Sequence, residues 1–255
     1  MQITIEPKSV QDYIPEWYDI LIYGGSGTGK TEFVGSFADA GEVLTIDTDG
    51  GILTQKTSPR LAHKDRLHFI DLSSSLEGYE TNQSAPWLIV HQVINDLASK
   101  GSFGKLTPRT VALDSLTTVA ACCMKHVLVI NKRPFGPPQY QDWGKQMELL
   151  RELILTGRRA KMNFICVAHE QYDRDEISGK AWCLPLVTGK LAGQIGAHFD
   201  EVYNTYVVQA GLKREYKMHT KPTGLVTAKS RFDLASPVDT NYSSLKGCIE
   251  NLQQP

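Results

Sequence analysis

One stretch of eight residues limits what this chain can fold into more than any other part of it. Residues 24–31 read Gly-Gly-Ser-Gly-Thr-Gly-Lys-Thr and match the pattern Gly-x-x-x-x-Gly-Lys-[Ser/Thr] of a phosphate-binding loop. The apolar run 19–23 precedes the loop, and helical spacing over 30–39 follows it. This order predicts a buried strand, a glycine-rich turn and a helix, which is the context that phosphate binding requires.

Glycines in such a turn let backbone N–H groups converge on phosphate oxygens with no Cβ in the way, and the helix N-terminus adds a favourable dipole. Within the loop, we expect Lys30 to reach the β- and γ-phosphates and the Thr31 hydroxyl to bind Mg²⁺. The residues predicted to hold the nucleotide are Gly24, Gly25, Ser26, Gly27, Thr28, Gly29, Lys30 and Thr31.

Asp114 is a second candidate for the metal site. It ends the apolar strand predicted at 110–113 and is followed by Ser115. A carboxylate at the carboxyl end of a strand beside the phosphate loop can hold a magnesium-bound water. The alternative is an ordinary helix N-cap, because Asp and Ser both favour that position.

Two other strand ends carry polar side chains. Asp47 and Asp49 follow the strand predicted at 43–46, and either could polarise the attacking water as a general base or cap a polar turn. His169 follows the strand predicted at 163–168. It could sense the γ-phosphate and signal to the loop that follows, or simply bond a neighbouring group.

The overall pattern is an alternation of strands and helices, which predicts an α/β fold with a mostly parallel sheet and helices on both faces. After residue 200 the pattern changes to short strands separated by turns, so we expect antiparallel strands at the C-terminal end. Strands are predicted at 19–23, 43–46, 68–71, 110–113, 163–168, 200–208, 214–219 and 224–228, and helices at 30–39, 87–97, 115–130 and 143–157.

Composition excludes several classes of protein. The chain has 255 residues, of which 41% are hydrophobic and 22% charged, and this excludes a disordered or collagen-like chain. No apolar run reaches the roughly 18 residues of a membrane span, and the N-terminus lacks a signal peptide, so no membrane partner is expected. The five cysteines lack paired spacing, which is typical of reduced thiols and favours a cytoplasmic location.

Two long loops stand out, because structureless loops above about 12–15 residues are usually functional or disordered. Residues 131–142 contain three prolines, and residues 170–190 are polar with Gly and Pro. A basic stretch follows at 205–231, where six Lys and Arg residues oppose one Glu. Local positive charge of this kind fits either a solvated hairpin or a phosphate-binding face.

These motifs in this order resemble the RecA-like P-loop ATPase core. The resemblance is closest to the small phage and prophage RecA-like single-strand annealing proteins of the Sak type. It rests on residues 24–31, the Asp-x-Asp of 47–49, Leu113-Asp114-Ser115 and the strand that ends at His169. It covers residues 18–232, which leaves an N-terminal arm (1–17) and a C-terminal tail (233–255). The arm, with Tyr13, Ile14 and Trp17, could pack on a neighbouring subunit or on its own core.

The resemblance implies an ATPase with ATP and Mg²⁺ as cofactors, and it implies that the loops 131–142 and 171–190 contact single-stranded DNA. Cations and aromatic rings in these loops suit backbone neutralisation and base stacking, although acidic neighbours dilute the charge and the rings could be packing anchors. The residues predicted to bind DNA are Lys132, Arg133, Phe135, Tyr140, Tyr172, Arg174, Lys180, Trp182 and Lys190.

The Lys-x-Arg-Phe sequence at 229–232 resembles a signature of RadA-type proteins. By this resemblance, Lys229 and Arg231 would reach the ATP of a neighbouring subunit and stabilise charge in the transition state. The implied protein assembles as a filament or ring on single-stranded DNA, works with a single-strand-binding protein, and promotes annealing or strand exchange. If phage-encoded, it would act in the cytoplasm of a bacterial host. The alternative is a basic end to an exposed strand.

Two departures from the RecA pattern keep other functions open. Asp49 stands where RecA has a glutamate and is one methylene shorter, and His169 replaces an amide side chain. The shortened carboxylate is compatible with a DNA-binding module in which the nucleotide is structural and turnover is negligible. A P-loop kinase or GTPase is a third class, but 131–134 lacks the terminal aspartate of the guanine-specific motif and 171–190 lacks an arginine-rich lid.

Overall fold

The computed structural model describes residues 9–10, 13, 15–73, 83–176, 178–211 and 213–252. Its centre is an eight-stranded sheet in the order β10-β9-β8-β1-β5-β4-β2-β3. The strands from β8 to β3 in this order are parallel, and β9 and β10 are antiparallel. The strands are β1 (Asp19–Gly24), β2 (Val43–Asp47), β3 (Leu67–Asp71), β4 (Thr110–Asp114), β5 (Asn163–Ala168), β8 (Glu201–Ala210), β9 (Lys213–His219) and β10 (Val238–Asp239).

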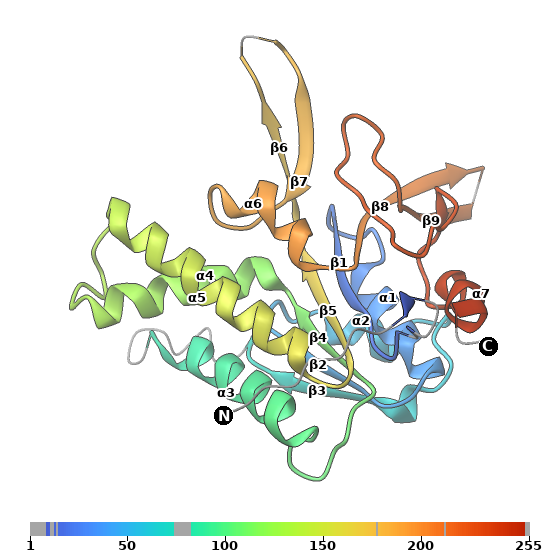
Figure 1. The fold of residues 1–255 in the computed structure, drawn as a ribbon, viewed down its shortest axis with the longest axis horizontal. Helices are drawn as coiled ribbons and strands as arrows, with labels where there is room; N and C mark the ends of the chain where they lie inside the picture. The colour runs from blue at the N-terminus through green and yellow to red at the C-terminus, as the bar shows by residue number, and fades with distance from the viewer. Residues whose placement is uncertain are drawn as a thin grey trace.

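Helices cover both faces of this sheet (Figure 1). One face carries α3 (Ala85–Lys100), α4 (Leu116–Ile130) and α5 (Tyr140–Arg159), and the other carries α1 (Lys30–Ser36), α2 (Ile52–Thr57) and α7 (Ser243–Leu252). The short elements are η2 (Phe37–Asp39), η3 (Lys64–Arg66), α6 (Leu191–Gln194) and η5 (Ile195–His198). The predicted α/β fold, with a mostly parallel sheet flanked by helices and antiparallel C-terminal strands, is confirmed.

The core is divided by the alternation of side chains along the central strands. In β1, Leu21 and Tyr23 pack with α3, α4 and α5, whereas Ile20 and Ile22 pack with α1 and α7. Every residue of β1, β2, β4 and β5 is buried. This is typical of parallel strands covered on both faces, and it explains why these strands appear in the sequence as short continuous apolar runs.

The segment 170–190 was expected to be a loop, and that expectation is wrong. It contains a two-stranded antiparallel hairpin of β6 (Glu170–Arg174) and β7 (Ala181–Pro185). The hairpin stands out from the body of the protein (Figure 1). The turn at its tip is closed by bonds from Asp175 N to the Lys180 carbonyl and from Gly179 N to the Asp175 carbonyl. β6 is half-buried to exposed and mostly polar, whereas β7 is apolar and buried or half-buried, so no single periodic pattern runs through the segment.

Two element boundaries also differ from the prediction. Residues 224–228 make only isolated bridges, Val226 to Cys183 and Lys229 just beyond to Val202, and the third antiparallel strand is β10. A Pro at 222, which cannot donate a backbone hydrogen bond, interrupts pairing before this segment. Helix α5 begins at Tyr140 rather than at 143, because Gln139 and Asp142 form a capping box at its start.

The two flanking segments pack on the body where the structure describes them. In the predicted tail, the Tyr242 ring lies 4.8 Å from that of Phe37, and the Tyr242 backbone N–H donates to Ser36 Oγ at 2.8 Å. In the predicted arm, Trp17 packs against the core of its own chain beneath the Arg109 guanidinium. Ile14 lies outside the described residues.

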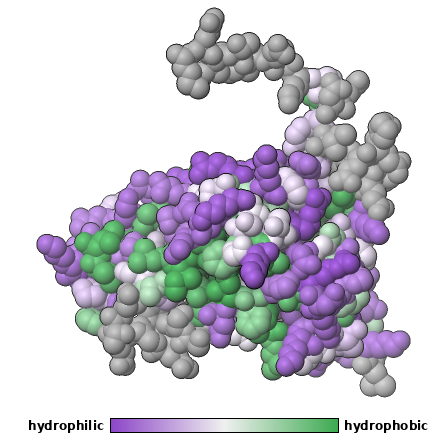
Figure 2. All heavy atoms as spheres, turned by 90° about the horizontal axis from the view of Figure 1, so that it is seen from below, coloured by the Kyte–Doolittle hydropathy of each residue, from purple (hydrophilic) through white to green (hydrophobic). Residues whose placement is uncertain are grey.

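Seen from below, the surface alternates between hydrophilic and hydrophobic residues (Figure 2). The hydrophobic residues gather mainly on the left half, which is the side of α3 to α5 in Figure 1. Among the described residues, no helix combines the length and apolar character needed to cross a membrane.

The packing of α5 on β5 predicts that two Gly→Ala substitutions in α5 change the free energy of unfolding in opposite directions. A Cβ on Gly157 would lie 2.5 Å from Cζ of the fully buried Phe164, whereas one on Gly144 in the same helix meets nothing within 4 Å. We expect Gly157→Ala to lower the free energy of unfolding by about 1–3 kcal/mol through overpacking. Gly144→Ala should raise it by about 0.5–1 kcal/mol. Denaturant titration checks both, and equal stabilisation by the two changes would contradict the packing.

Candidate nucleotide-binding site

The phosphate loop lies at the carboxyl end of β1, between its neighbours β5 and β8. The loop is fixed to β8 because Thr28 Oγ1 lies 2.7 Å from Thr205 Oγ1. Gly24 approaches the same threonine so closely that a Cβ there would lie 2.4 Å from Thr205 Oγ1. Gly29 has φ 92°, a left-handed conformation that favours glycine, and α1 begins at the next residue. The predicted strand, turn and helix are therefore all present.

The two predicted metal ligands are in direct contact. Thr31 Oγ1 donates a hydrogen bond to Asp114 Oδ2 at 2.7 Å, although 83 residues separate them. Asp114 ends β4, and Ser115 caps α4 by accepting from Thr118 N. Burial raises the pKa of Asp114 to about 6, and the charges of Asp49 and Asp47 add to the effect. The capping role therefore belongs to Ser115, which leaves the Asp114 carboxylate facing Thr31.

This pair suits a magnesium ion held together with phosphates. Among the described residues, no group of three or more His, Cys, Asp and Glu is arranged to hold a metal ion. Mg²⁺ is usually bound through one or two carboxylates, substrate phosphates and water rather than by a cage of protein ligands. Asp114 is a buried carboxyl group beside the Thr31 hydroxyl, and other acids lie nearby. A divalent cation bound there would stabilise the negative charge of these acids.

Lys30 lies folded against the loop. Its Nζ donates to the carbonyls of Gly24 and Gly25 at 2.8 and 2.6 Å. Burial lowers its pKa, while the carboxylates of Asp114, Glu170 and Asp49 oppose that shift. The ammonium group is thus held inside the loop, among acids, where an incoming phosphate would meet it.

The structure distinguishes Asp47 from Asp49, which the sequence left as equal candidates for the general base. The Asp47 carboxylate is buried and accepts backbone N–H bonds from Asp49, Gly51 and Ile52 at 3.0–3.2 Å. It organises the turn into α2 and has no free oxygen directed at the loop. Asp49 instead projects into the cavity at the phosphate loop. Of the two aspartates, Asp49 is therefore the one that lines this cavity.

His169 faces Asp49 across this cavity. The His169 Nε2 atom lies 3.1 Å from Asp49 Oδ2, and its backbone N–H donates to Thr117 Oγ1 at 3.0 Å. Both side chains line a cavity of about 600 Å³ together with Lys30, Thr31 and Asp114. The carboxyl ends of β1, β2, β4 and β5 thus bring five predicted site residues into one space.

Glu170 shares the strand end with His169 and is a further site residue, although the sequence assigns it no role of its own. Its Oε1 lies 3.2 Å from the position of a Cβ on Gly25, so its carboxylate is beside the loop. Its Oε2 accepts from Asn204 Nδ2 and Cys183 Sγ, each at 3.5 Å. The signal was present in the sequence, since Glu170 directly follows His169 at a strand end. Glu170 also opens the β6–β7 hairpin, and so connects that hairpin to the loop.

The residues predicted to bind DNA fall in two separate places (Figure 1). Lys132, Phe135 and Tyr140 are exposed near the far end of α4. Arg133 bonds to the buried carboxylate of Asp142 at 2.7 Å and holds that segment in place. Four more lie on the projecting hairpin, and Lys190 is the residue before α6. The hairpin residues are Tyr172, Arg174, Lys180 and Trp182.

Lys229 and Arg231 lie away from the phosphate loop of their own chain. Lys229 pairs with Val202 on β8, whereas Gly24 pairs with Thr205, about 10 Å further along the strand. Lys229 Nζ donates to the carbonyls of Gly196 and Phe199, and Arg231 forms an ion pair with Asp200. Neither side chain lines the cavity at the loop.

Comparison with known families agrees with this geometry, since the AAA domain family matches residues 16–232. The chain belongs to the AAA domain family. It is therefore a P-loop NTPase domain, as the loop and its partners on β4 indicate. No curated protein matches the chain.

Two solved structures are similar in fold. The crystal structure of flagellar accessory protein FlaH from Methanocaldococcus jannaschii has 13% identity and a TM-score of 0.46, with 81% of this chain and 78% of that chain covered. The crystal structure of KaiC-like protein PH0186 from Pyrococcus horikoshii OT3 has 12% identity and a TM-score of 0.44, with 81% and 79% covered. These likenesses concern the fold alone.

The different surroundings of the two aspartates predict different effects on stability. Asp47→Ala leaves three backbone N–H groups without their acceptor, so we expect the free energy of unfolding to fall by about 2 kcal/mol or more. Asp49→Ala removes only a partly exposed pair with His169, and we expect a loss below about 1 kcal/mol. Urea denaturation measures both values, and equal losses would contradict the separate roles.

Proposed function

We propose that this protein is an ATPase that binds ATP and Mg²⁺ at the phosphate loop and acts on single-stranded DNA in recombination, by annealing or strand exchange. One observation carries the ATPase part of the proposal. The Thr31–Asp114 bond and the Asp49–His169 pair lie in a single cavity together with Lys30. A nucleotide-binding loop needs such groups around the γ-phosphate to hydrolyse its ligand rather than merely hold it.

Each residue has a role set by its position. Backbone N–H groups of 24–29 hold the phosphates, and Lys30 turns from the Gly24 and Gly25 carbonyls toward them. Thr31 and Asp114 hold the magnesium ion, which neutralises charge on the phosphate oxygens when bound. These groups raise the affinity for a triphosphate and position it for attack at the γ-phosphate.

Asp49 is proposed as the general base. In this role its carboxylate would orient a water molecule for attack on the γ-phosphorus, in line with the bond to the leaving ADP. His169 holds the carboxylate at 3.1 Å and limits its rotation. Because His169 is followed directly by the β6–β7 hairpin, a change at the γ-phosphate can reach that hairpin through Asp49 and Glu170.

The hairpin is proposed as the single-strand-binding element. Lys180 Nζ lies 5.3 Å from the centre of the Trp182 ring, and Tyr172 is 66% exposed. A cation that neutralises the backbone beside rings that stack on bases is the combination that sequence-tolerant binding of single strands uses. The exposed residues Lys132, Phe135 and Tyr140 would extend the contact along a longer strand.

Assembly into a filament or ring is part of the proposal. Lys229 and Arg231 lie too far from their own phosphate loop to act on it, so their proposed target is the nucleotide of a neighbouring copy. They would have to leave their present partners, the carbonyls of Gly196 and Phe199 and the carboxylate of Asp200. Hydrolysis would then depend on assembly, and a single-strand-binding protein is a further proposed partner on the DNA.

The first test is steady-state ATP hydrolysis with Mg²⁺, measured with and without a single-stranded oligonucleotide. We expect a rate that rises with DNA and that falls at least about 100-fold in Lys30→Ala, which lacks the phosphate-binding cation. Asp49→Asn should lower the rate by about 10²–10⁴-fold, because it removes the base and keeps the shape. Tight ATP binding without turnover would favour a structural nucleotide. Transfer of phosphate to a small acceptor would favour a kinase.

The second test concerns DNA binding by the hairpin. Trp182→Ala should weaken binding to single-stranded DNA by about 1–3 kcal/mol through lost stacking. Lys180→Ala should also lessen the salt dependence, by about 0.7 in the slope of log K against log salt. Lys105→Ala is the matched control. It removes the same charge from an exposed loop that leads into the amino end of β4, whereas the hairpin follows the carboxyl end of β5. Equal effects of the Lys105 and Lys180 substitutions would contradict a hairpin contact.

A further inference from the structure

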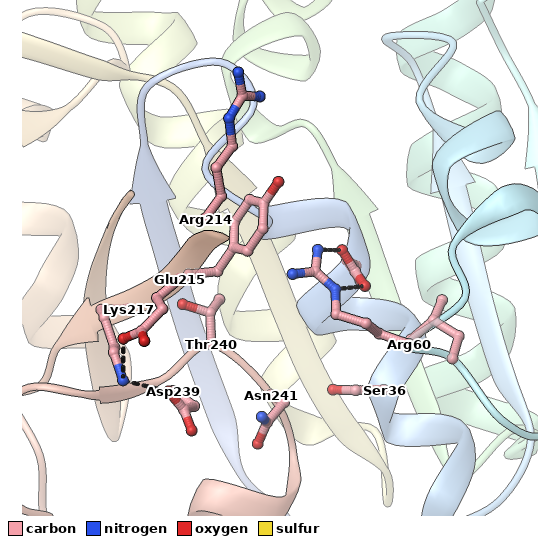
Figure 3. Close-up of a pocket in the computed structure, with 11 residues that line it drawn as sticks. Ser36, Arg60, Arg214, Glu215, Lys217, Asp239, Thr240 and Asn241 are labelled. Carbon is pink, nitrogen blue, oxygen red and sulfur yellow. Dashed lines mark hydrogen bonds and ion pairs between the residues drawn. The ribbon is translucent and has the colours of Figure 1, made fainter. Parts of the chain in front are cut away.

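A second cavity, of about 390 Å³, lies beside the phosphate loop (Figure 3). Residues of α1 and the segment after α2 form one wall, and β9 and β10 with the residues after them form the other. Its size falls within the range of small-molecule sites, about 300–1,000 Å³. Its lining includes Glu32, Arg60, Tyr216, Asp239, Thr240 and Asn241.

This cavity continues from the phosphate site. Glu32, which directly follows Thr31, lines both cavities. Two ring atoms of Tyr216 lie 3.1 and 3.5 Å from the position of a Cβ on Gly29, so the ring is next to the end of the loop. A molecule held by its phosphates on the loop would therefore have open space in this direction.

The order of strands fixes which end of a nucleotide points there. Asp49 and Asp114 follow β2 and β4, which lie on one side of β1 in the sheet. β9 and β10 lie on the other side of β1. If the terminal phosphate faces Asp49 and Asp114, the opposite end of the molecule leaves the loop toward β9 and β10. That end carries the sugar and the base.

The walls of this cavity are held in place. Arg60 bonds to both carboxylate oxygens of Glu32, and its guanidinium lies 4.0 Å from the centre of the Tyr216 ring. Ser58 Oγ also donates to Glu32 at 2.5 Å. Asn241 Oδ1 accepts bonds from Ser243 and Ser244 at the start of α7. This leaves the Asn241 amide Nδ2 as the group available to an added molecule.

Thr240 gives an independent indication of a ligand. It is 7% exposed and lines the cavity, and its Oγ1 has no hydrogen-bond partner. Buried polar atoms without partners are rare in proteins, and each one calls for an explanation such as a ligand. The Asp239 and Glu215 carboxylates beside it are both engaged by Lys217. Among the described residues, the Thr240 hydroxyl is thus a buried polar group in this wall without a hydrogen-bond partner.

We propose that this cavity binds the ribose and base of the nucleoside triphosphate whose phosphates lie on residues 24–31. Tyr216 provides the aromatic wall, and Thr240 and Asn241 provide the polar contacts. The inference rests on the proposed function, because it needs a nucleotide on the loop. It adds that β9 and β10 select a nucleoside triphosphate over a bare polyphosphate, so Tyr216 and Thr240 determine specificity.

The test compares the binding of ATP and of inorganic tripolyphosphate, each with Mg²⁺, by calorimetry. We expect wild type to bind ATP at least about 10-fold more tightly, because stacking on an aromatic ring and added polar contacts act only on the nucleoside. Tyr216→Ala should lower the affinity for ATP about 10-fold or more and leave that for tripolyphosphate within about 2-fold. Thr240→Val, which keeps the shape, should lower only the affinity for ATP.

Tripolyphosphate binding also verifies folding, since a variant that still binds it has an intact loop. Tyr13→Ala is the matched control, because this exposed tyrosine lies outside both cavities. Equal binding of ATP and tripolyphosphate by wild type would overturn the inference and leave the phosphate site standing. Equal losses for both ligands in Tyr216→Ala and Thr240→Val would also overturn it. Failure of wild type to bind either ligand would instead overturn the proposed function.

Discussion

The hydrogen bond from Thr31 to Asp114 is the contact on which the rest of this site depends. It joins the first turn of α1 to the end of β4 across 83 residues, and it exists only because β5 alone separates β1 from β4 in the sheet. Parallel strands end at the same edge, so one topology brings the loop, the metal candidate and the Asp49–His169 pair together. The chemistry is therefore a consequence of strand order rather than of any single motif.

The site concentrates acids around one buried lysine, and the fold has to stabilise them. Asp47 is satisfied by three backbone N–H groups, Asp49 by His169, and Glu170 by Asn204 and Cys183. Among the described residues, the Asp114 carboxylate has a hydrogen bond from the Thr31 hydroxyl, and burial raises its pKa to about 6 despite that bond. The acids with several partners therefore shape the site, and Asp114, which is buried beside the loop, is the position where a cation would be most stabilising.

Most of the central fold could be predicted from the sequence, because buried parallel strands are continuous apolar runs and the glycine loop marks where β1 ends. The hairpin at 170–185 could not be predicted in this way. Its first strand is polar, and its second strand is an apolar run of only five residues, Ala181–Pro185, in a segment that is otherwise polar and interrupted by Gly and Pro. The short strand β10 was missed for a similar reason, since two residues pairing with β9 leave no periodic pattern.

The sequence by itself determined the nucleotide loop, the helix that follows it and the acids that end the strands, because each depends on residue types at fixed local spacing. Only the tertiary structure decided between Asp47 and Asp49, since their difference is whether a carboxylate meets backbone N–H groups or faces a cavity. It also decided that Glu170 lies beside the loop, and that Tyr216 and Thr240 border a second cavity. Those residues come from strands far apart in the chain, and contacts at such separation are set by how the sheet is ordered.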